Sequence, residues 1–334
     1  MSQSHTGKHA NSYAGGMRIF TKTDPHRPHA IKCEALGLKW LAEAMPHGGA
    51  PVVPVLDYQP GIMTLVEIPN GRPTRHAAYQ FGQTLAVTHA AGAPSFGCPP
   101  PGWEGDGVIG RMELPLRQTS EETLNRTWGE FFAEDRILPC LPVARNNRSL
   151  SADDVSIIEE VCKRLADGHW DAPQPGLVHG PVARIHGDLW SGNVLWARRE
   201  DILWTNPLPD NVTDPIVGVL IDPAAQGGHA ETDLAFLEVF GQSFLEDIYA
   251  GYNSVSPLAD GWEERRCVHQ LYLLALHAAI FGGTYGPATM YTARQVLRHE
   301  HTHRTPYPRQ SSLSKVTSSP IHTCRRRSEW NGRE

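Results

Sequence analysis

Apolar and polar residues near the start of the chain follow the spacing of strands and of one helix. Residues 17–22 alternate as a half-buried strand does, and residues 51–58 and 61–68 are two further apolar runs of strand length. Residues 30–45 place apolar side chains three and four positions apart, which predicts an amphipathic helix. The sequence PNGRP at 69–73 breaks any regular element. The pattern therefore predicts a small strand-rich segment followed by a short linker.

After this linker the spacing becomes mainly helical. Four segments carry apolar residues on one helical face: residues 75–90, 151–165, 233–247 and 263–282. Ser151 and Asp154 form a capping-box pattern at the start of the second of these. Residues 94–111 are rich in proline and glycine and are expected to form a loop, whereas the continuous apolar run 215–222 predicts a buried strand.

The end of the chain has a different composition. From about residue 301, Ser, Thr, Pro and Arg dominate, so this segment cannot bury enough apolar surface to fold. The sequence thus predicts three parts: a strand-rich lobe at 1–70 with short first strands, a mainly helical lobe at 71–300, and a disordered basic tail at 301–334.

Charge and cysteine content narrow the class of protein. The net charge is −6, which argues against a general nucleic-acid binder. An acidic body must bind an anion through a few aimed groups and metal ions. The six cysteines form no C-x-x-C pair, the N-terminus lacks the apolar run of a signal peptide, and the longest apolar stretch, 271–283, is too short to span a bilayer. We expect a cytoplasmic protein with reduced thiols and no membrane partner, and the oligomeric state stays open.

The stretch ARIHGDLWSGNVLW at 183–196 places polar residues in a tight loop between two apolar segments. Asp188 and Asn193 lie five residues apart in it, and Asp222 ends the predicted buried strand. Oxygen-bearing side chains at such positions suit Mg²⁺. Phosphoryl transfer uses this set, because one Asp accepts the proton of the attacking hydroxyl while an Asn and a second Asp hold metal against the phosphates. Each residue alone would be read as a turn or cap residue, but the joint spacing favours catalysis.

The strand-rich lobe is expected to supply a cation for the phosphates. Lys22 ends the strand at 17–22, and Glu34 follows on the next helix. A Lys held by a helical Glu is typical of two-lobed kinases, although the same residues could form an ordinary surface pair. Residues 66–68 then fall where a hinge carries adenine-binding backbone groups.

Three stretches resemble the fructosamine kinase (ketosamine-3-kinase) family: HGDLWSGN at 186–193, IDPAAQGGHAETDLAF at 221–236 and LADGWEERRCVHQLYLLALHAAIFGGTYG at 258–286. That family is similar in fold to aminoglycoside and choline kinases. The resemblance runs from about Phe20 to about Arg298 and implies a two-lobed, protein-kinase-like α+β fold that uses ATP with Mg²⁺. The implied reaction is phosphorylation of a ketosamine at its 3-hydroxyl, after which elimination releases the amine, a deglycation repair.

The resemblance also implies a role for each candidate site residue. Asp188 would be the catalytic base, and Asn193 and Asp222 the metal ligands. The nucleotide-binding lobe would contribute Lys22, which contacts phosphates, Glu34, which holds it, and the adenine-binding Val66, Glu67 and Ile68. His186 and Asp233 would support the catalytic loop, and Trp190 would form a wall of the sugar pocket. Without the resemblance, a helix cap would explain Asp233 and packing would explain Trp190.

The sequence departs from the family pattern in two places. The family begins with a Gly-Gly turn that opens a hairpin over the phosphates, but here Gly15 and Gly16 come only shortly before Lys22. This predicts an abbreviated or absent phosphate turn. Ala230 stands where an Arg is usual, which predicts a weaker substrate or loop contact.

Other functions stay open on the sequence alone. A kinase for an aminoglycoside or an amino alcohol would share the core motif, and the short N-terminus would also suit a nucleotide-binding module without catalysis. The sequence HEHTH at 299–303 satisfies H-E-x-x-H, with His322 or Glu329 as a third zinc ligand. Because this motif begins the basic tail, a solvated histidine-rich tract is the expected explanation.

Overall fold

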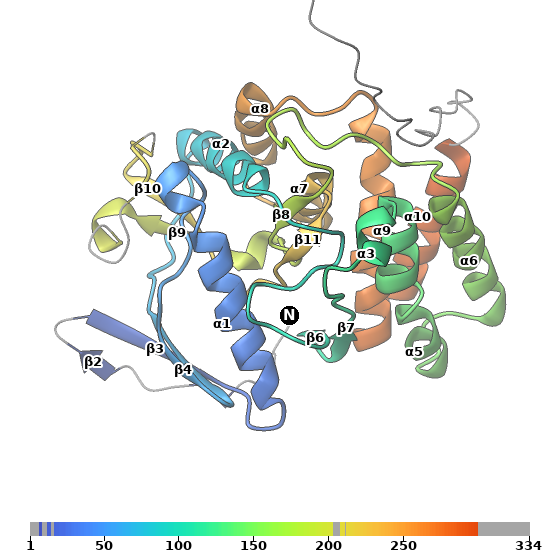
Figure 1. The fold of residues 1–334 in the computed structure, drawn as a ribbon, viewed down its shortest axis with the longest axis horizontal. Coiled ribbons are helices and arrows are strands. Elements are labelled where there is room, and N and C mark those ends of the chain that lie inside the picture. The colour runs from blue at the N-terminus through green and yellow to red at the C-terminus, as the bar shows by residue number, and fades with distance from the viewer. Residues whose placement is uncertain (1–6, 9–11, 15–16, 203–207, 211, 300–334) are drawn as a thin grey trace, which may run out of the picture. The chain divides into compact units, whose positions relative to one another are not determined.

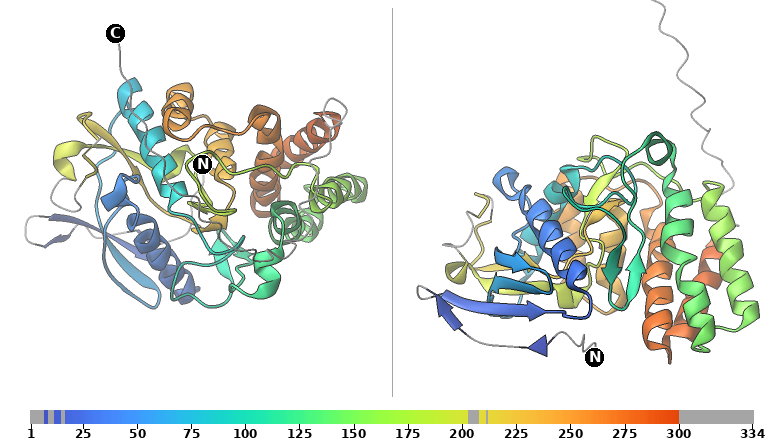
Figure 2. Two further views of the ribbon diagram at one scale, coloured as in Figure 1. Left: turned by 45° about the horizontal axis from the view of Figure 1, so that its top comes forward. Right: turned by 60° about the horizontal axis from the view of Figure 1, so that its bottom comes forward.

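A computed structural model describes residues 7–8, 12–14, 17–202, 208–210 and 212–299. All of these residues belong to one unit of the chain, which ends at His303. A strand-rich part lies beside a larger helical part in this unit (Figures 1 and 2). The predicted basic tail lies outside the described residues.

An antiparallel sheet forms the strand-rich part. Its central strands pair in the order β3 (Met17–Thr23), β5 (Ile62–Val66), β4 (Val55–Gln59), while β1 (Gly7–Lys8) and β2 (Ser12–Ala14) pair with opposite ends of β3. The three predicted strands are therefore confirmed. β4 starts later than predicted, directly after Pro54, which has no N–H for a sheet. α1 (Pro28–Ala42) confirms the predicted helix and packs on β4 and β5 with Ile31, Leu38 and Leu41 buried (Figure 1).

Residues 67–74 contain no helix or strand, as the predicted linker requires. The Gly71 amide donates to the Trp196 carbonyl at 2.7 Å, and the Trp196 amide donates to the Asn70 side chain at 2.8 Å. These bonds fasten the linker to β9 (Val194–Arg198). α2 (Arg75–Ala90) then begins after Thr74, whose hydroxyl oxygen caps it, and matches the predicted range.

Two short antiparallel ribbons frame the predicted catalytic loop. β8 (Ala183–Ile185) pairs with β11 (Gln226–Gly228), and β9 pairs with β10 (Ile216–Leu220). Ile185 is opposite Gln226 and Val194 is opposite Leu220. The loop between β8 and β9 and the loop between β10 and β11 thus begin and end at paired positions, which holds the two loops side by side.

Helices make up most of the remaining structure. They are α3 (Glu121–Asn125), α4 (Trp128–Phe132), a π-helical turn (Ala133–Ile137), α5 (Cys140–Asn146), α6 (Ala152–Ala166), α7 (Ala230–Val239), α8 (Leu245–Val255), α9 (Trp262–Phe281) and α10 (Tyr285–His299). The 3₁₀ turns are Met45–His47, Ser191–Asn193 and Arg199–Asp201. The capping box of Ser151 and Asp154 at the start of α6 is confirmed, as is the helix predicted at 263–282.

Three sequence predictions were wrong or incomplete. The helix expected over 233–247 is two helices, because Gly241 and Phe244 adopt left-handed backbone angles, φ +77° and +56°, between α7 and α8. The loop at 94–111 contains β6 (Gly107–Ile109), which forms a hairpin with β7 (Met112–Leu114). α10 was not predicted. Among the described residues, none of the helices has the length and hydrophobicity needed to cross a membrane.

A shared hydrophobic core joins the two parts. Leu38 of α1 and Met63 of β5 belong to the same buried cluster as Phe81 of α2, Val219 of β10 and Tyr252 of α8. A second cluster fills the space among α4, α6, α9 and α10. The first core therefore holds the sheet and α1 against the ribbons that carry the candidate site.

Candidate active site

The loop after β8 brings two predicted residues into contact. The Asn193 side-chain amide donates to the Asp188 carboxylate at 3.1 Å and to the Asp188 carbonyl at 2.7 Å. Gly187 has φ +80°, and a Cβ there would lie 2.2 Å from the Ala224 carbonyl oxygen. Glycine thus allows the loop to pass closely over the segment that contains Asp222.

His186 links this loop to the one that carries Asp222. Its Nδ1 accepts the Asp188 amide at 3.2 Å, and its Nε2 donates to the Ile221 carbonyl at 2.8 Å. The Ile221 amide in turn donates to the Asn193 carbonyl at 3.1 Å. Burial lowers the pKa of His186, which favours the neutral ring that this pattern of one donor and one acceptor requires.

Asp233, in the first turn of α7, is hydrogen-bonded to the backbone of the candidate catalytic loop. Its carboxylate accepts the amides of His186 at 2.7 Å and Gly187 at 2.9 Å. His89 of α2 contacts the same carboxylate at 3.1 Å and Tyr252 of α8 at 2.9 Å. Burial raises the pKa of Asp233, but these hydrogen bonds outweigh burial, so that its pKa lies below the usual range. The sequence analysis did not single out His89, which the structure places in contact with the candidate residue Asp233.

Asp222 meets the strand-rich part through Lys22. The Lys22 ammonium lies 2.8 Å from both oxygens of Glu34 and 3.1 Å from Asp222 Oδ1. The predicted contact between Lys22 and Glu34 is therefore present. Asp222 has φ +51°, a left-handed conformation that is uncommon for residues other than glycine and that occurs often at functional sites.

The charges in this site shift one another's pKa values. Burial, with a smaller contribution from the nearby carboxylates of Asp222 and Asp233, raises the pKa of Asp188 to about 8, against the hydrogen bond from Asn193. Burial lowers the pKa of Lys22, but attraction to Glu34 and Asp222 outweighs burial and raises it above its usual value. Lys22 is therefore a fixed positive charge between two carboxylates.

The predicted hinge residues lie at the end of β5. The Val66 amide donates to the Pro54 carbonyl at 3.2 Å and the Glu67 amide to the Arg18 carbonyl at 3.0 Å. Ile68, which is 8% exposed, makes no backbone hydrogen bond within the described part of the chain. Phe20 lies two residues before Lys22 and thus on the same face of β3, with 42% of its surface exposed. The sequence analysis missed this exposed aromatic side chain beside the phosphate-binding candidate.

Trp190 begins a row of aromatic side chains near Asp188. Its ring lies 5.7 Å from that of Phe240, which lies 4.8 Å from the ring of His277. The His277 ring lies 5.0 Å from that of Tyr285. Phe240 directly follows α7, whereas His277 and Tyr285 belong to α9 and α10, and the sequence analysis assigned a role to none of them.

Two further sequence expectations concern Ala230 and the HEHTH zinc motif. Ala230 is fully buried at the start of α7, where its amide donates to the Gln174 side chain at 3.0 Å. The zinc candidates fall mostly outside the described residues: His299 ends α10 and its side chain is not described, while Glu300, His303, His322 and Glu329 lie beyond it.

Known proteins with a similar sequence place the chain in a family. A model of the fructosamine kinase family matches residues 3–299. The chain belongs to the fructosamine kinase family. A curated relative from Synechocystis sp., named a probable ketoamine kinase, is 34% identical over 228 residues, which span 68% of this chain and 65% of that protein.

Solved structures support the same family and also show which fold the chain adopts. A candidate fructosamine-3-kinase from Thermobifida fusca has a TM-score of 0.71 and 36% identity, covering 88% of this chain and 93% of that one. The choline kinase of Streptococcus pneumoniae has a TM-score of 0.51 at 13% identity, covering 89% and 93%, and shows the fold alone. The predicted family and the two-lobed, protein-kinase-like α+β fold are confirmed.

Proposed function

We propose that this protein transfers the γ-phosphate of ATP to a hydroxyl group of a ketosamine such as a fructosamine or a ribulosamine. The observation that carries the proposal is that three separate segments bring together two hydrogen-bonded pairs, Asp188 with Asn193 and Asp222 with Lys22. The Ile221 amide, which donates to the Asn193 carbonyl, joins the two loops that carry these pairs. Phosphoryl transfer needs a base, metal ligands and a phosphate-binding cation at one place.

Asn193 and Asp222 fit a magnesium ion. The Asn193 nitrogen is the atom that donates to Asp188, which leaves the amide oxygen for a cation. The Asp222 side chain is 46% exposed and offers a second hard oxygen donor. These two residues would hold Mg²⁺, which when bound neutralises charge on the phosphates of ATP.

Asp188 is the proposed general base. The acceptor hydroxyl oxygen attacks the γ-phosphorus, its proton passes to the Asp188 carboxylate, and the bond from the γ-phosphorus to the bridging oxygen breaks to release ADP. Burial raises the pKa of Asp188 above that of an ordinary aspartate, and a carboxylate with a higher pKa is the stronger proton acceptor. Lys22 supplies positive charge to the phosphates while Glu34 keeps its ammonium in place.

The nucleotide base is proposed to bind between the sheet and the hinge. Val66, Glu67 and Ile68 would meet the adenine edge, and the exposed ring of Phe20 would cover its face. Among the described residues, β1 pairs with β3 over two residues and β2 over three, while Gly15 and Gly16 lie outside the described residues. Because this Gly-Gly pair comes so shortly before Lys22 in the sequence, we expect weak ATP binding that depends strongly on magnesium.

The aromatic row beside Asp188 is the proposed wall of the acceptor site. Sugars present C–H faces that pack on aromatic rings, and Trp190 is two residues from the base. The family and the names of its relatives favour a ketosamine acceptor. Enolisation between C1 and C2 of such a molecule would let a phosphate at C3 leave as inorganic phosphate, and water would then hydrolyse the resulting imine, which releases the amine and reverses glycation.

An acceptor screen tests this function. Purified protein is incubated with ATP, Mg²⁺ and fructosamines, ribulosamines, aminoglycosides or amino alcohols, and mass spectrometry with ³¹P NMR locates any new phosphate. Phosphate at C3 of a ketosamine is expected. Turnover of an aminoglycoside or amino alcohol alone would contradict the acceptor, and ATP binding without any turnover would contradict catalysis.

A pair of tryptophan variants tests the proposed acceptor wall. Trp190→Ala is expected to raise the KM for the acceptor and to leave the KM for ATP unchanged. Trp170→Ala, a half-buried tryptophan between α6 and β8, serves as the matched control and should change neither.

A further inference from the structure

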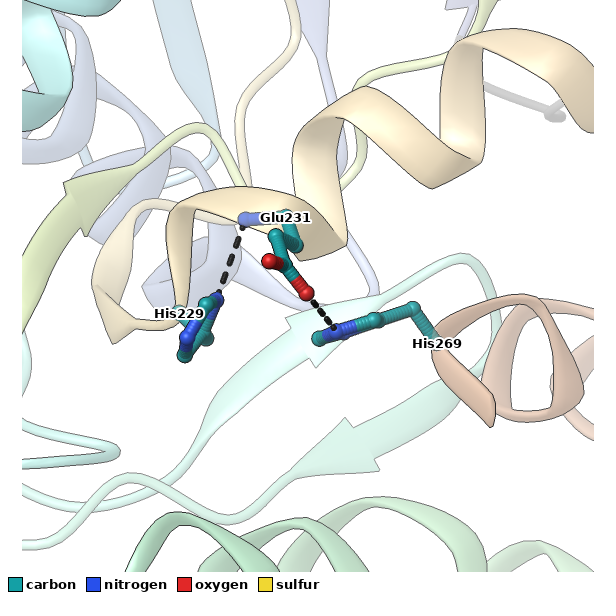
Figure 3. A group of neighbouring side chains, drawn as sticks. All are labelled: His229, Glu231 and His269. Carbon is teal, nitrogen blue, oxygen red and sulfur yellow. Dashed lines mark hydrogen bonds and ion pairs between the residues drawn. The ribbon is translucent and has the colours of Figure 1, made fainter. Parts of the chain in front are cut away.

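Two histidines and a glutamate form a buried cluster where α7 begins. His229 caps α7, Glu231 lies in its first turn, and His269 projects from α9 (Figure 3). All three are at most 2% exposed, and their ligand-type atoms lie within 4.8 Å of one another. The sequence analysis assigned no role to this cluster.

The hydrogen bonds of the cluster argue against a metal ion. Arg265 of α9 donates to both Glu231 oxygens, at 2.9 and 2.6 Å. His229 Nδ1 accepts the Glu231 amide, and its Nε2 faces the Ala172 carbonyl at 3.3 Å. His269 contacts Glu231 at 3.3 Å and the Thr232 hydroxyl at 2.9 Å. Every atom that could bind a metal is therefore engaged, and a guanidinium occupies the carboxylate.

The protonation states suit the same arrangement. Burial lowers the pKa of His229 to about 4 and also lowers the pKa of His269, so both rings are neutral at pH 7. Burial raises the pKa of Glu231, but the hydrogen bonds from His269 and Arg265 oppose burial, and the pKa lies below its usual range, so that the carboxylate stays charged. The cluster is thus one bidentate ion pair supported by two neutral rings.

The cluster is continuous with the support of the catalytic loop. Asp233 lies two residues after Glu231 in the same first turn, and it accepts the amides of His186 and Gly187. A rotation or slide of this turn would move the Asp233 carboxylate relative to those amides. Glu231 is joined to α9, and Asp233 is joined to α2 through His89, so the turn is held from two sides.

We propose that Glu231, clamped by Arg265 and His269, is a positioning residue that sets the first turn of α7 so that Asp233 holds the catalytic loop in its active geometry. This inference rests on the proposed function for its kinetic readout, but not for its structural one. A displacement of ~1 Å at a reacting group costs roughly 100-fold in rate, so the clamp affects kcat although Glu231 touches no substrate.

Glu231→Gln tests the clamp, and Glu238→Gln is its matched control. Glu238, at the other end of α7, pairs with Arg266 of α9 at 3.3 Å, so it joins the same two helices at the surface. Glu231→Gln is expected to lower kcat for the acceptor by about 10- to 100-fold with little change in the KM for ATP. It should also speed hydrogen exchange of the His186 and Gly187 amides. The control should change none of these values.

The other possible outcomes of these experiments also support or overturn the proposed role of Glu231. A lower melting temperature with unchanged kcat and unchanged amide exchange would make Glu231 merely structural and would overturn the proposal. Stoichiometric zinc in purified protein that is lost in His269→Ala would identify a metal site instead. If wild type phosphorylates no ketosamine, the proposed function fails, yet faster amide exchange in Glu231→Gln would still support the clamp.

Arg265→Lys covers the case in which Glu231→Gln does not fold. Lysine keeps the positive charge and loses the two-pronged contact with the carboxylate. It is expected to lower kcat less than Glu231→Gln does and to speed exchange of the same two amides. Wild-type kcat and wild-type exchange in Arg265→Lys would overturn the proposal.

Discussion

Replacing Asp188 with asparagine removes the proposed base while preserving the loop. The amide has nearly the same shape as the carboxylate, and its oxygen can still accept the Asn193 amide, which lies 3.1 Å from the Asp188 carboxylate. An amide cannot take up a proton at neutral pH. Loss of a general base costs about 10²–10⁴ in rate, which corresponds to a barrier about 3–5 kcal/mol higher. We expect kcat to fall by this factor.

The same substitution should not weaken the fold. Burial raises the pKa of Asp188 to about 8, from an ordinary value of 3.8 for an exposed aspartate. Between these two pH values the Asp188 carboxyl is protonated in the folded protein and ionised in the unfolded chain. Its ionisation at pH 7 therefore favours the unfolded state. Asparagine carries no charge, so the melting temperature of Asp188→Asn without magnesium is expected to equal or exceed that of wild type.

The assay separates catalysis from binding. ADP release gives kcat, and a thermal-shift titration with ATP and Mg²⁺ gives the affinity for the nucleotide. We expect Asp188→Asn to keep the wild-type affinity and Asp222→Asn to bind the nucleotide more weakly. Asp247→Asn, which breaks a surface ion pair with Arg75, is the control and should behave as wild type. A kcat for Asp188→Asn close to that of wild type would refute the assignment of the base.

Three further predictions concern the phosphate contact, the buried histidines and the tail. Lys22→Ala should lower kcat/KM for ATP by about 10²–10³ because it removes a charge aimed at the phosphates; a change confined to melting temperature would contradict this. Acid should destabilise the protein, because the pKa of His229 is about 4 in the folded protein against an ordinary value of 6.5, so the unfolded chain binds more protons between these values. His229 alone is expected to lower the free energy of unfolding by roughly 2 kcal/mol by pH 5. His229→Asn keeps an oxygen that can cap α7, and it should make the melting temperature depend less on pH. Truncation after His303, or His299→Ala combined with His303→Ala, should leave activity and melting temperature nearly unchanged, and loss of stoichiometric zinc together with activity in the double variant would show that the HEHTH motif has a role.

Local patterns predict those parts of the fold that depend on neighbouring residues. α2 is a regular amphipathic helix with a capping residue, and the sequence predicts both of its ends. The break between α7 and α8 escapes the same reasoning, because Phe244 adopts a left-handed angle that nothing in its residue type requires. α10 buries Met290, Ala293 and Val296 against α6 and α9, and its few apolar residues become a helix face only when those partners are present.

The residues of the candidate site likewise fall into those that local sequence patterns predict and those that only the folded structure brings together. Asp188 and Asn193 lie in one tight loop, so their chemistry can be read from spacing, and the pairing of Lys22 with Glu34 follows from a strand and the next helix. His89 meets Asp233 across 144 residues of sequence, and nothing near His89 marks it as different from an ordinary helical histidine. The contact exists because α2 and α8 pack closely and leave the His89 ring between Tyr252 and Asp233.

Glu231 illustrates why residues that position a catalytic loop matter for the proposed reaction and yet are difficult to predict from a sequence. A base must be held to a fraction of an ångström, and a loop that contains a flexible residue such as Gly187 needs support from the surrounding fold to reach that tolerance. The fold supplies the missing rigidity through Asp233, whose two oxygens receive consecutive loop amides. Asp233 is only as fixed as the first turn of α7, and that turn is tied to α9 by Arg265. The rate of the reaction is therefore expected to depend on a residue that lies outside the catalytic loop and contacts no substrate, which the comparison of Glu231→Gln with Glu238→Gln measures directly.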